Sequence, residues 1–123
     1  MRDIKFRAWN KDIKEMFEVG QITLEKGIWD YQPDDRKHIG ISIPYQPSFI
    51  LMQYTGLKDK NGKEIYEGDI VQQFDIKENG IIKYKYGQFG INSLGMFWNI
   101  HPTKLEVIGN IYDNPDLLEK ASD

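Results

Sequence analysis

Apolar and polar residues alternate with a period of two along most of this chain, which is the spacing of β-strands. Near the N-terminus, Ile4, Phe6 and Ala8 fall on one face of an extended segment, with charged residues between them. Turn-forming residues follow at 10–12, and residues 13–19 read as a returning strand. The N-terminus is therefore predicted to form a β-hairpin.

Short strand patterns continue through the rest of the chain, and Gly20 is predicted to end the first hairpin. The further predicted strands are residues 21–24, 28–31, 39–43, 49–54, 65–66, 70–74, 81–86, 89–91, 96–100 and 105–112. Pro44 and Pro47 interrupt this pattern because proline has no backbone N–H, so a boundary is predicted after residue 48. Closely spaced strands of this kind are typical of a small barrel or sandwich.

One short helix is predicted at the C-terminus. Asn114 can cap it, Pro115 suits its first position, and Asp116 favours the positive end of the helix dipole. The predicted fold is mainly β with minor α. An N-terminal β-hairpin lobe at 1–48 precedes a small SH3-like barrel with the C-terminal helix at 49–123, or both form one integrated domain.

The composition narrows the available chemistry. The 123 residues include no cysteine, which excludes disulfides, thiolate zinc sites, iron–sulfur clusters and cysteine nucleophiles. The two histidines, His38 and His101, lie far apart in the sequence, and neither belongs to a cluster of metal ligands. No metal and no cofactor are therefore predicted.

The chain contains no apolar run of the ~18 residues that a membrane span needs, and it begins with alternating charged and apolar residues. A signal peptide would need a continuous apolar segment there. We expect a cytoplasmic protein with no membrane partner.

Three motifs are typical of turns and are predicted to be structural. Asn-Gly suits a type I′ turn because both residues tolerate a positive φ, and Asp beside Gly can accept hydrogen bonds from nearby backbone amides. The predicted turn residues are Asn61 with Gly62, Gly68 with Asp69, and Asn114 with Pro115.

An enzymatic hypothesis needs a convergent set of side chains, and the sequence offers Glu67, Asp69 and His101 as a candidate hydrolase set. Nothing in their spacing brings them together, and the turn at Gly68 explains the two carboxylates more simply. We therefore predict no catalytic residue and no enzyme.

Nucleic-acid binding is the alternative function that the lysines favour. The candidate contacts are Lys58, Lys60, Lys63, Lys83 and Lys85. Strand alternation places Lys83 and Lys85 on one face and Tyr84 and Tyr86 on the other, which predicts buried tyrosines and an ordinary solvated lysine face. Residues 61–123 also carry 6 basic and 10 acidic side chains, a net charge of −4, which disfavours phosphate binding.

A protein partner is the hypothesis that the aromatic content favours. Tyrosine, phenylalanine and tryptophan make up 13% of the residues. Among them, Trp9, Trp29, Trp98, Tyr31 and Tyr45 cannot all be assigned to a core, and Trp and Tyr concentrate at interface hot spots. Short edge strands also invite pairing with another chain. A protein partner or a homo-oligomer is expected.

Three segments carry a family resemblance. They are residues 4–9, IKFRAW, residues 53–71, QYTGLKDKNGKEIYEGDIV, and residues 105–118, LEVIGNIYDNPDLL. In this order and spacing they resemble the YopX-like proteins of phages and prophages. The resemblance implies a phage accessory protein in the host bacterial cell and brings no established catalytic residue or cofactor. The leading hypothesis is a non-enzymatic protein-binding or self-assembly module, and the alternative is a small nucleic-acid-binding barrel.

Overall fold

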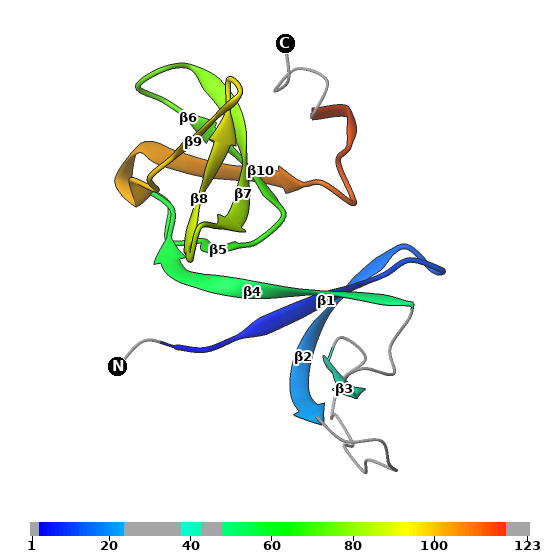
Figure 1. Cartoon of the computed structure of the whole chain (residues 1–123). Coiled ribbons are helices and arrows are strands. Elements are labelled where there is room, and N and C mark those ends of the chain that lie inside the picture. The colour runs from blue at the N-terminus through cyan, green and yellow to red at the C-terminus, as the bar shows by residue number, and fades with distance from the viewer. Residues whose placement is uncertain (1–2, 24–37, 43–47, 118–123) are drawn as a thin grey trace. The chain divides into compact units, whose positions relative to one another are not determined.

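The computed structural model describes residues 3–23, 38–42 and 48–117 (Figure 1). Strands predominate there, so the predicted mainly β class is confirmed. The elements are β1 Phe6–Asn10, β2 Glu15–Thr23, β3 His38–Ser42, β4 Phe49–Lys58, β5 Glu64–Tyr66, β6 Asp69–Gln73, β7 Glu78–Lys85, β8 Gln88–Ser93, β9 Met96–Trp98, the 3-10 helix η1 Pro102–Lys104 and β10 Leu105–Asn110. The chain divides into two units, Ile4–Gln53 and Met1–Asp3 with Tyr54–Asp123. The domain boundary expected after residue 48 stays a prediction.

In the N-terminal unit, β1 lies between β2 and β4. It pairs antiparallel with β2, so the predicted N-terminal hairpin is confirmed, and its other side pairs antiparallel with residues 49–53 of β4. Asn10 holds the hairpin turn, because its Oδ1 accepts hydrogen bonds from the amides of Asp12 and Ile13. This is the local bonding that makes Asn a frequent turn residue.

The strand that was expected to end at Gly20 continues to Thr23, so that prediction is wrong. β2 pairs in parallel with β3, and the register shifts between Val19 and Gln21, on either side of the glycine. Glycine inside a strand often marks such an irregularity, since it has no side chain to pack. Residues 21–23 are therefore part of β2, and the strand predicted at 28–31 lies outside the described residues.

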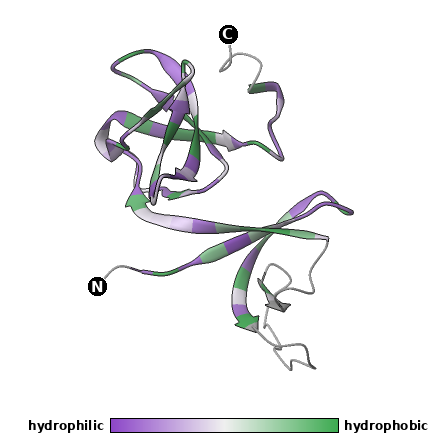
Figure 2. Cartoon of the chain, viewed as in Figure 1, coloured by the Kyte–Doolittle hydropathy of each residue, from purple (hydrophilic) through white to green (hydrophobic). Residues whose placement is uncertain are grey.

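In the C-terminal unit, five strands form an antiparallel sheet in the order β10-β6-β7-β8-β9. Green apolar and purple polar segments alternate along these strands in Figure 2. The buried core cluster consists of Ile65, Val71, Ile82, Ile91, Leu105 and Val107. Burying an aliphatic side chain of this size contributes about 1.5–3 kcal/mol, so this cluster holds the strands together.

The two edges of this sheet differ. At the β10 edge, the Leu105 carbonyl accepts a hydrogen bond from the Lys60 amide at 3.1 Å, and the Val107 amide donates to Asp59 Oδ2 at 2.9 Å. At the other edge, β9 pairs with β8 and with no other described strand. The sheet is open, and the closed SH3-like barrel expected from the sequence is not formed in the described residues.

The segment that covers β10 is a tight turn organised by Asp59. Its Oδ1 accepts hydrogen bonds from the amides of Asn61, at 2.8 Å, and Lys63, at 2.9 Å. The Gly62 amide donates to the Asp59 carbonyl. Asp59, two residues before the predicted turn at Asn61 and Gly62, thus joins this turn to β10.

The predicted turn at Gly68 and Asp69 connects β5 to β6. The Gly68 amide donates to the Ile82 carbonyl, and the Gly68 carbonyl accepts from the Ile111 amide. Asp69 is buried, and its Oδ2 accepts a hydrogen bond from the Tyr66 amide at 2.7 Å. Both residues are thereby engaged in holding the start of β6.

At the end of the described chain, a helical turn begins at Asp116 and Leu117, and the rest of the predicted helix lies outside the described residues. Asn114 does not cap it with its side chain as expected. Its Oδ1 instead accepts a hydrogen bond from the Asn110 amide, and its side chain lies where a Cβ on Gly109 would have to be. No helix in the described ranges is long and apolar enough to cross a membrane.

Candidate functional site

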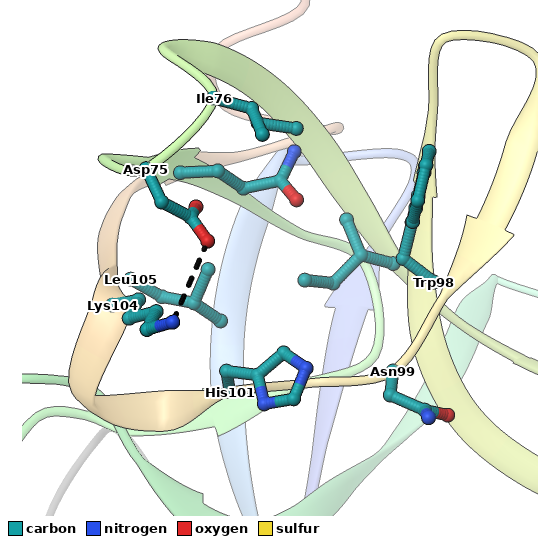
Figure 3. Close-up of a pocket in the computed structure, with 9 residues that line it drawn as sticks. Asp75, Ile76, Trp98, Asn99, His101, Lys104 and Leu105 are labelled. Atoms are coloured by element: carbon teal, nitrogen blue, oxygen red, sulfur yellow. Dashed lines mark ion pairs between the residues drawn. The ribbon is translucent and has the colours of Figure 1, made fainter.

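The C-terminal unit contains a pocket of about 260 Å³ (Figure 3). Its lining residues come from β6, the segment after β6, β8, β9, the connection between β9 and β10, and β10 itself. They are Gln73, Asp75, Ile76, Ile91, Trp98, Asn99, His101, Lys104 and Leu105. The pocket therefore lies where the two edge strands of the open sheet are joined by residues 99–104.

The open sheet explains why a pocket can form at this place. β9 ends at Trp98, and Pro102, which has no backbone N–H to continue a ladder, begins η1. The chain then returns as β10 at Leu105, opposite Gln73 of β6. Ile91 and Leu105 belong to the core cluster, so the pocket reaches down to the core of this unit.

Two polar side chains of the pocket wall are held in fixed orientations. Gln73 is 5% exposed, and its Nε2 donates to Ser93 Oγ at 3.1 Å and to the Glu78 carbonyl at 3.3 Å. Ser93 Oγ donates in turn to the Asn79 carbonyl at 3.0 Å. The Trp98 indole Nε1 donates to the Ser93 carbonyl at 2.9 Å. The amide of Gln73 and the ring of Trp98 are thus preorganised.

Charged groups lie on one side of the pocket. Lys104 Nζ is 3.8 Å from Asp75 Oδ2, and these side chains are 57% and 49% exposed. Figure 3 shows this pair facing Trp98 across the pocket, with His101 and Asn99 on a third side. An ion pair so exposed is worth at most about 1 kcal/mol, so it can rearrange around a bound group at little cost.

The hydrolase set expected as an alternative is not assembled. Asp69 is opposite Asn110 at one end of the β6–β10 pair, while His101 precedes Leu105 at the other end. Four strand residues span about 13 Å, which is beyond direct contact. Glu67 and Asp69 do not line the pocket that contains His101. Within the described ranges, no three His, Asp or Glu side chains form a group that could hold a metal ion.

The five candidate lysines fall into two groups. Lys58, Lys60 and Lys63 lie in and beside the turn that covers β10, and Lys60 Nζ is 3.8 Å from the centre of the Phe74 ring. Lys83 and Lys85 lie on β7, two strands away from β10 in the sheet. The structure places these groups at different parts of the sheet rather than in one patch.

The expectation that Tyr84 and Tyr86 are buried is wrong. Tyr84 is 54% exposed, and its ring packs edge-on against Phe89 at 4.9 Å between centroids. Tyr86 is 88% exposed, because it has left the strand. With φ values of +56° and +78°, Tyr86 and Gly87 form the two-residue turn between β7 and β8.

This turn brings Tyr86 to the face of the sheet that carries the β7 lysines. The Phe97 ring covers Gly90, where a Cβ would lie 2.5 Å from its Cζ, and its centroid is 5.9 Å from that of Tyr86. Lys85 Nζ is 5.7 Å from the Phe97 centroid. Lys83 lies opposite Gly90 on the same face. We call Lys83, Lys85, Tyr86 and Phe97 the aromatic–lysine face.

Electrostatics single out Asp59, which is buried beneath the turn covering β10. Burial alone would raise the pKa of this carboxyl. The amides of Val107, Lys63 and Asn61, together with the charge of Lys63, outweigh burial, and the pKa of Asp59 is lowered. Asp59 is therefore a charged structural group.

Comparison with known proteins assigns the family. The sequence matches the family described as YopX protein over residues 5–119. The chain belongs to the YopX family. A search of curated proteins found no match.

Two crystal structures resemble this YopX-family chain. Protein EF1440 from Enterococcus faecalis is 28% identical, with a TM-score of 0.62, and the match covers 96% of this chain and 99% of that one. Protein yopX from Bacillus subtilis is 20% identical, with a TM-score of 0.55, and the match covers 92% and 96%. The second likeness shows the fold alone, and neither brings an activity to this chain.

Sequence reasoning missed most of the pocket. The sequence indicates Trp98 only as one of five aromatic residues that cannot all belong to a core, and His101 only as a candidate metal ligand or hydrolase residue. Gln73 carried no signal, because its importance comes from Ser93 and Glu78, which reach it only in the folded sheet. The aromatic–lysine face was missed because strand alternation was extended one residue too far, to Tyr86.

Proposed function

We propose that this YopX-family chain is a non-enzymatic accessory protein of a phage or prophage, which acts in the host cytoplasm by binding another protein through the aromatic–lysine face. The observation that carries this proposal is Tyr86. Its ring is 88% exposed yet held against Phe97, beside two lysines. Exposed, positioned aromatic side chains are typical of interface hot spots.

The charges of this face favour an acidic partner. No ion pair joins Lys83 or Lys85 to a carboxylate in the described residues. A partner that presents acidic and apolar groups would therefore complement the face, since opposite charges steer association and set specificity. A symmetric dimer through the same face would instead place lysines of both copies at one isologous interface.

Nucleic acid remains the second candidate, on one observation. Tyr86 and Phe97 lie on the same face as Lys85, and single-stranded nucleic acid is bound by aromatic rings beside cations. The face offers only two lysines, and the net charge of residues 61–123 is −4. A protein partner is favoured because phosphate affinity grows with the number of neutralised charges.

Two labelled probes separate these functions in fluorescence anisotropy titrations. One is a peptide of alternating Glu and Phe, and the other is an oligothymidylate of about twelve nucleotides. We expect the peptide to bind at least about tenfold more tightly at the same salt concentration. If the oligothymidylate binds more tightly, the face binds nucleic acid instead of a protein. If neither probe binds, the proposal is contradicted.

Matched variants locate the binding. Tyr86→Ala and Lys85→Glu are expected to weaken peptide binding by about tenfold each, since they remove the proposed aromatic anchor and reverse one charge. Tyr84→Ala is the control, because Tyr84 is also exposed but lies on the opposite face of β7. Light scattering of the free protein tests self-assembly, and a dimer that Tyr86→Ala dissociates would show that the face binds a second copy.

A further inference from the structure

The wall of the pocket contains one hydrogen-bond acceptor, Gln73 Oε1, that has no donor among the described residues. The Gln73 side chain makes two hydrogen bonds, both donated by Nε2, and no described residue donates to its Oε1. Oε1 is not fully buried, and Gln73 lines the pocket, so an occupant of the pocket can approach this oxygen. A buried carbonyl oxygen without a donor costs free energy, so an occupant that donates an N–H or O–H to it is favoured.

The other walls of the pocket, where it reaches the core, are apolar and partly aromatic. Ile91 and Leu105 belong to the core, and Ile76 and Trp98 extend these walls toward solvent. The Trp98 ring is fixed by its bond to the Ser93 carbonyl, so it presents a stationary aromatic surface. Such a surface favours a second aromatic ring in an offset or edge-on arrangement.

The volume limits the size of the occupant. A cavity of ~150 Å³ holds a benzene molecule, and drug-sized ligands use ~300–1,000 Å³. At about 260 Å³, this pocket suits one substituted ring with a short stem, and it is too small for a nucleotide. The acceptor at Gln73 requires that the ring carry a donor.

We propose that the pocket binds a phenol group, donated as the side chain of a tyrosine on an extended protein segment, with its hydroxyl donating to Gln73 Oε1. The ring lies against Trp98 between Ile76 and the core. The ion pair of Lys104 and Asp75 flanks the entrance, where it can bond to the polar backbone of the segment. The side chains of the pocket and those of the aromatic–lysine face lie on opposite faces of β8 and β9, so a side-chain variant of one site leaves the other in place.

The β9 edge explains why the phenol would come from a protein segment. Ser93 and Met96 face each other across the two-residue turn between β8 and β9, which makes them a hydrogen-bonded pair. The next residue, Phe97, therefore directs its N–H and C=O away from β8. No described strand pairs with that edge, and an added segment there would present alternate side chains to the pocket face beside Trp98.

The test compares two soluble probes that differ by one hydroxyl, N-acetyl-tyrosinamide and N-acetyl-phenylalaninamide. Titration of the ¹⁵N-labelled full chain is followed by NMR, through the indole N–H signal of Trp98 and the side-chain amide signal of Gln73. We expect saturable millimolar binding of the tyrosine probe, at least about tenfold tighter than the phenylalanine probe. Equal binding of both probes, or binding of neither, overturns the proposal.

Two variants assign the preference to the pocket. Gln73→Met keeps the length of the side chain but removes the acceptor, and it is expected to bring the two probes within about twofold of each other. Trp98→Leu is expected to weaken both probes and leaves Gln73 in place, so it tests the site even if the Gln73 variant does not fold. Tyr86→Ala, outside the pocket, should change neither affinity. A tyrosine preference that survives in folded Gln73→Met contradicts the assigned acceptor.

A third probe distinguishes a protein segment from a free phenol. The peptide N-acetyl-Thr-Val-Tyr-Val-Thr-amide supplies the same ring on an extended backbone. We expect it to bind at least about tenfold more tightly than N-acetyl-tyrosinamide and to shift the backbone amide signal of Phe97. If the peptide binds no better than the single amino acid, the strand-addition part of the proposal is wrong and the pocket binds free phenols.

Discussion

The two edges of the C-terminal sheet differ in whether their backbone groups are hydrogen-bonded to another segment. The β10 edge is covered by the turn at 59–63, through bonds from Lys60 to Leu105 and from Val107 to Asp59. The β9 edge has no such cover in the described residues and lies beside the pocket. An uncovered edge exposes unpaired backbone groups, which stable proteins usually protect. We expect the β10 edge to serve stability, and we propose that the β9 edge serves binding.

The largest expected effect comes from removing the cover of β10. Asp59→Ala deletes the acceptor of three backbone amides, those of Asn61, Lys63 and Val107. Buried donors left without an acceptor cost free energy, so we expect the free energy of unfolding to fall by about 3 kcal/mol in urea titrations. A loss below about 1 kcal/mol would show that the covering turn contributes little.

The same carboxylate predicts a pH dependence. The pKa of Asp59 is lowered in the folded protein, so the folded state favours the ionised form. Its contribution is therefore fully present above the unfolded pKa, about 3.9, and is lost as the pH falls through the lower folded value. The urea concentration at the unfolding midpoint should therefore fall between pH 6 and pH 2 in the natural chain. The fall should be smaller in Asp59→Asn, which has no carboxylate at this position.

Damage to the β9 side should have a smaller effect on stability. A Cβ at position 90 would lie 2.5 Å from Phe97 Cζ and 2.8 Å from the Trp98 carbonyl oxygen, so Gly90→Ala forces the Phe97 ring and the β9 backbone to move. Overpacking typically costs ~1–3 kcal/mol, and the value here should be near the lower end because Phe97 lies on a short edge strand. Thermal unfolding of Gly90→Ala combined with Phe97→Leu should recover part of the loss. If the double variant is no more stable than Gly90→Ala alone, the loss of stability does not come from the contact with the Phe97 ring.

The smallest effect is expected at the pocket entrance. Asp75→Ala and Lys104→Ala remove an exposed ion pair, and each should change the free energy of unfolding by less than about 0.5 kcal/mol. A double-mutant cycle in urea measures the coupling between the two side chains. A coupling above about 1 kcal/mol would mean that the entrance is part of the stabilising structure, which would weaken the contrast between the two edges.

Local patterns predicted the parts of the fold that depend on neighbours in sequence. The β1–β2 hairpin follows from alternation and the turn chemistry of Asn10. The parallel pairing of β2 with β3 was missed, because it joins segments separated by a long connection. The pocket was missed for the same reason, since Gln73, Ile91 and Leu105 meet only through strand order and register.

Strand β4 has a consequence for dissecting this chain. Its residues 49–53 pair with β1, and its later residues Tyr54 and Lys58 pair with β5. A fragment that ends at residue 48 would deprive β1 of one of its two antiparallel neighbours, and a fragment that begins at residue 54 would start in the middle of a strand. The chain therefore cannot be divided along β4 without removing strand pairing from one of the two units. We expect the two halves to be inherited and expressed together.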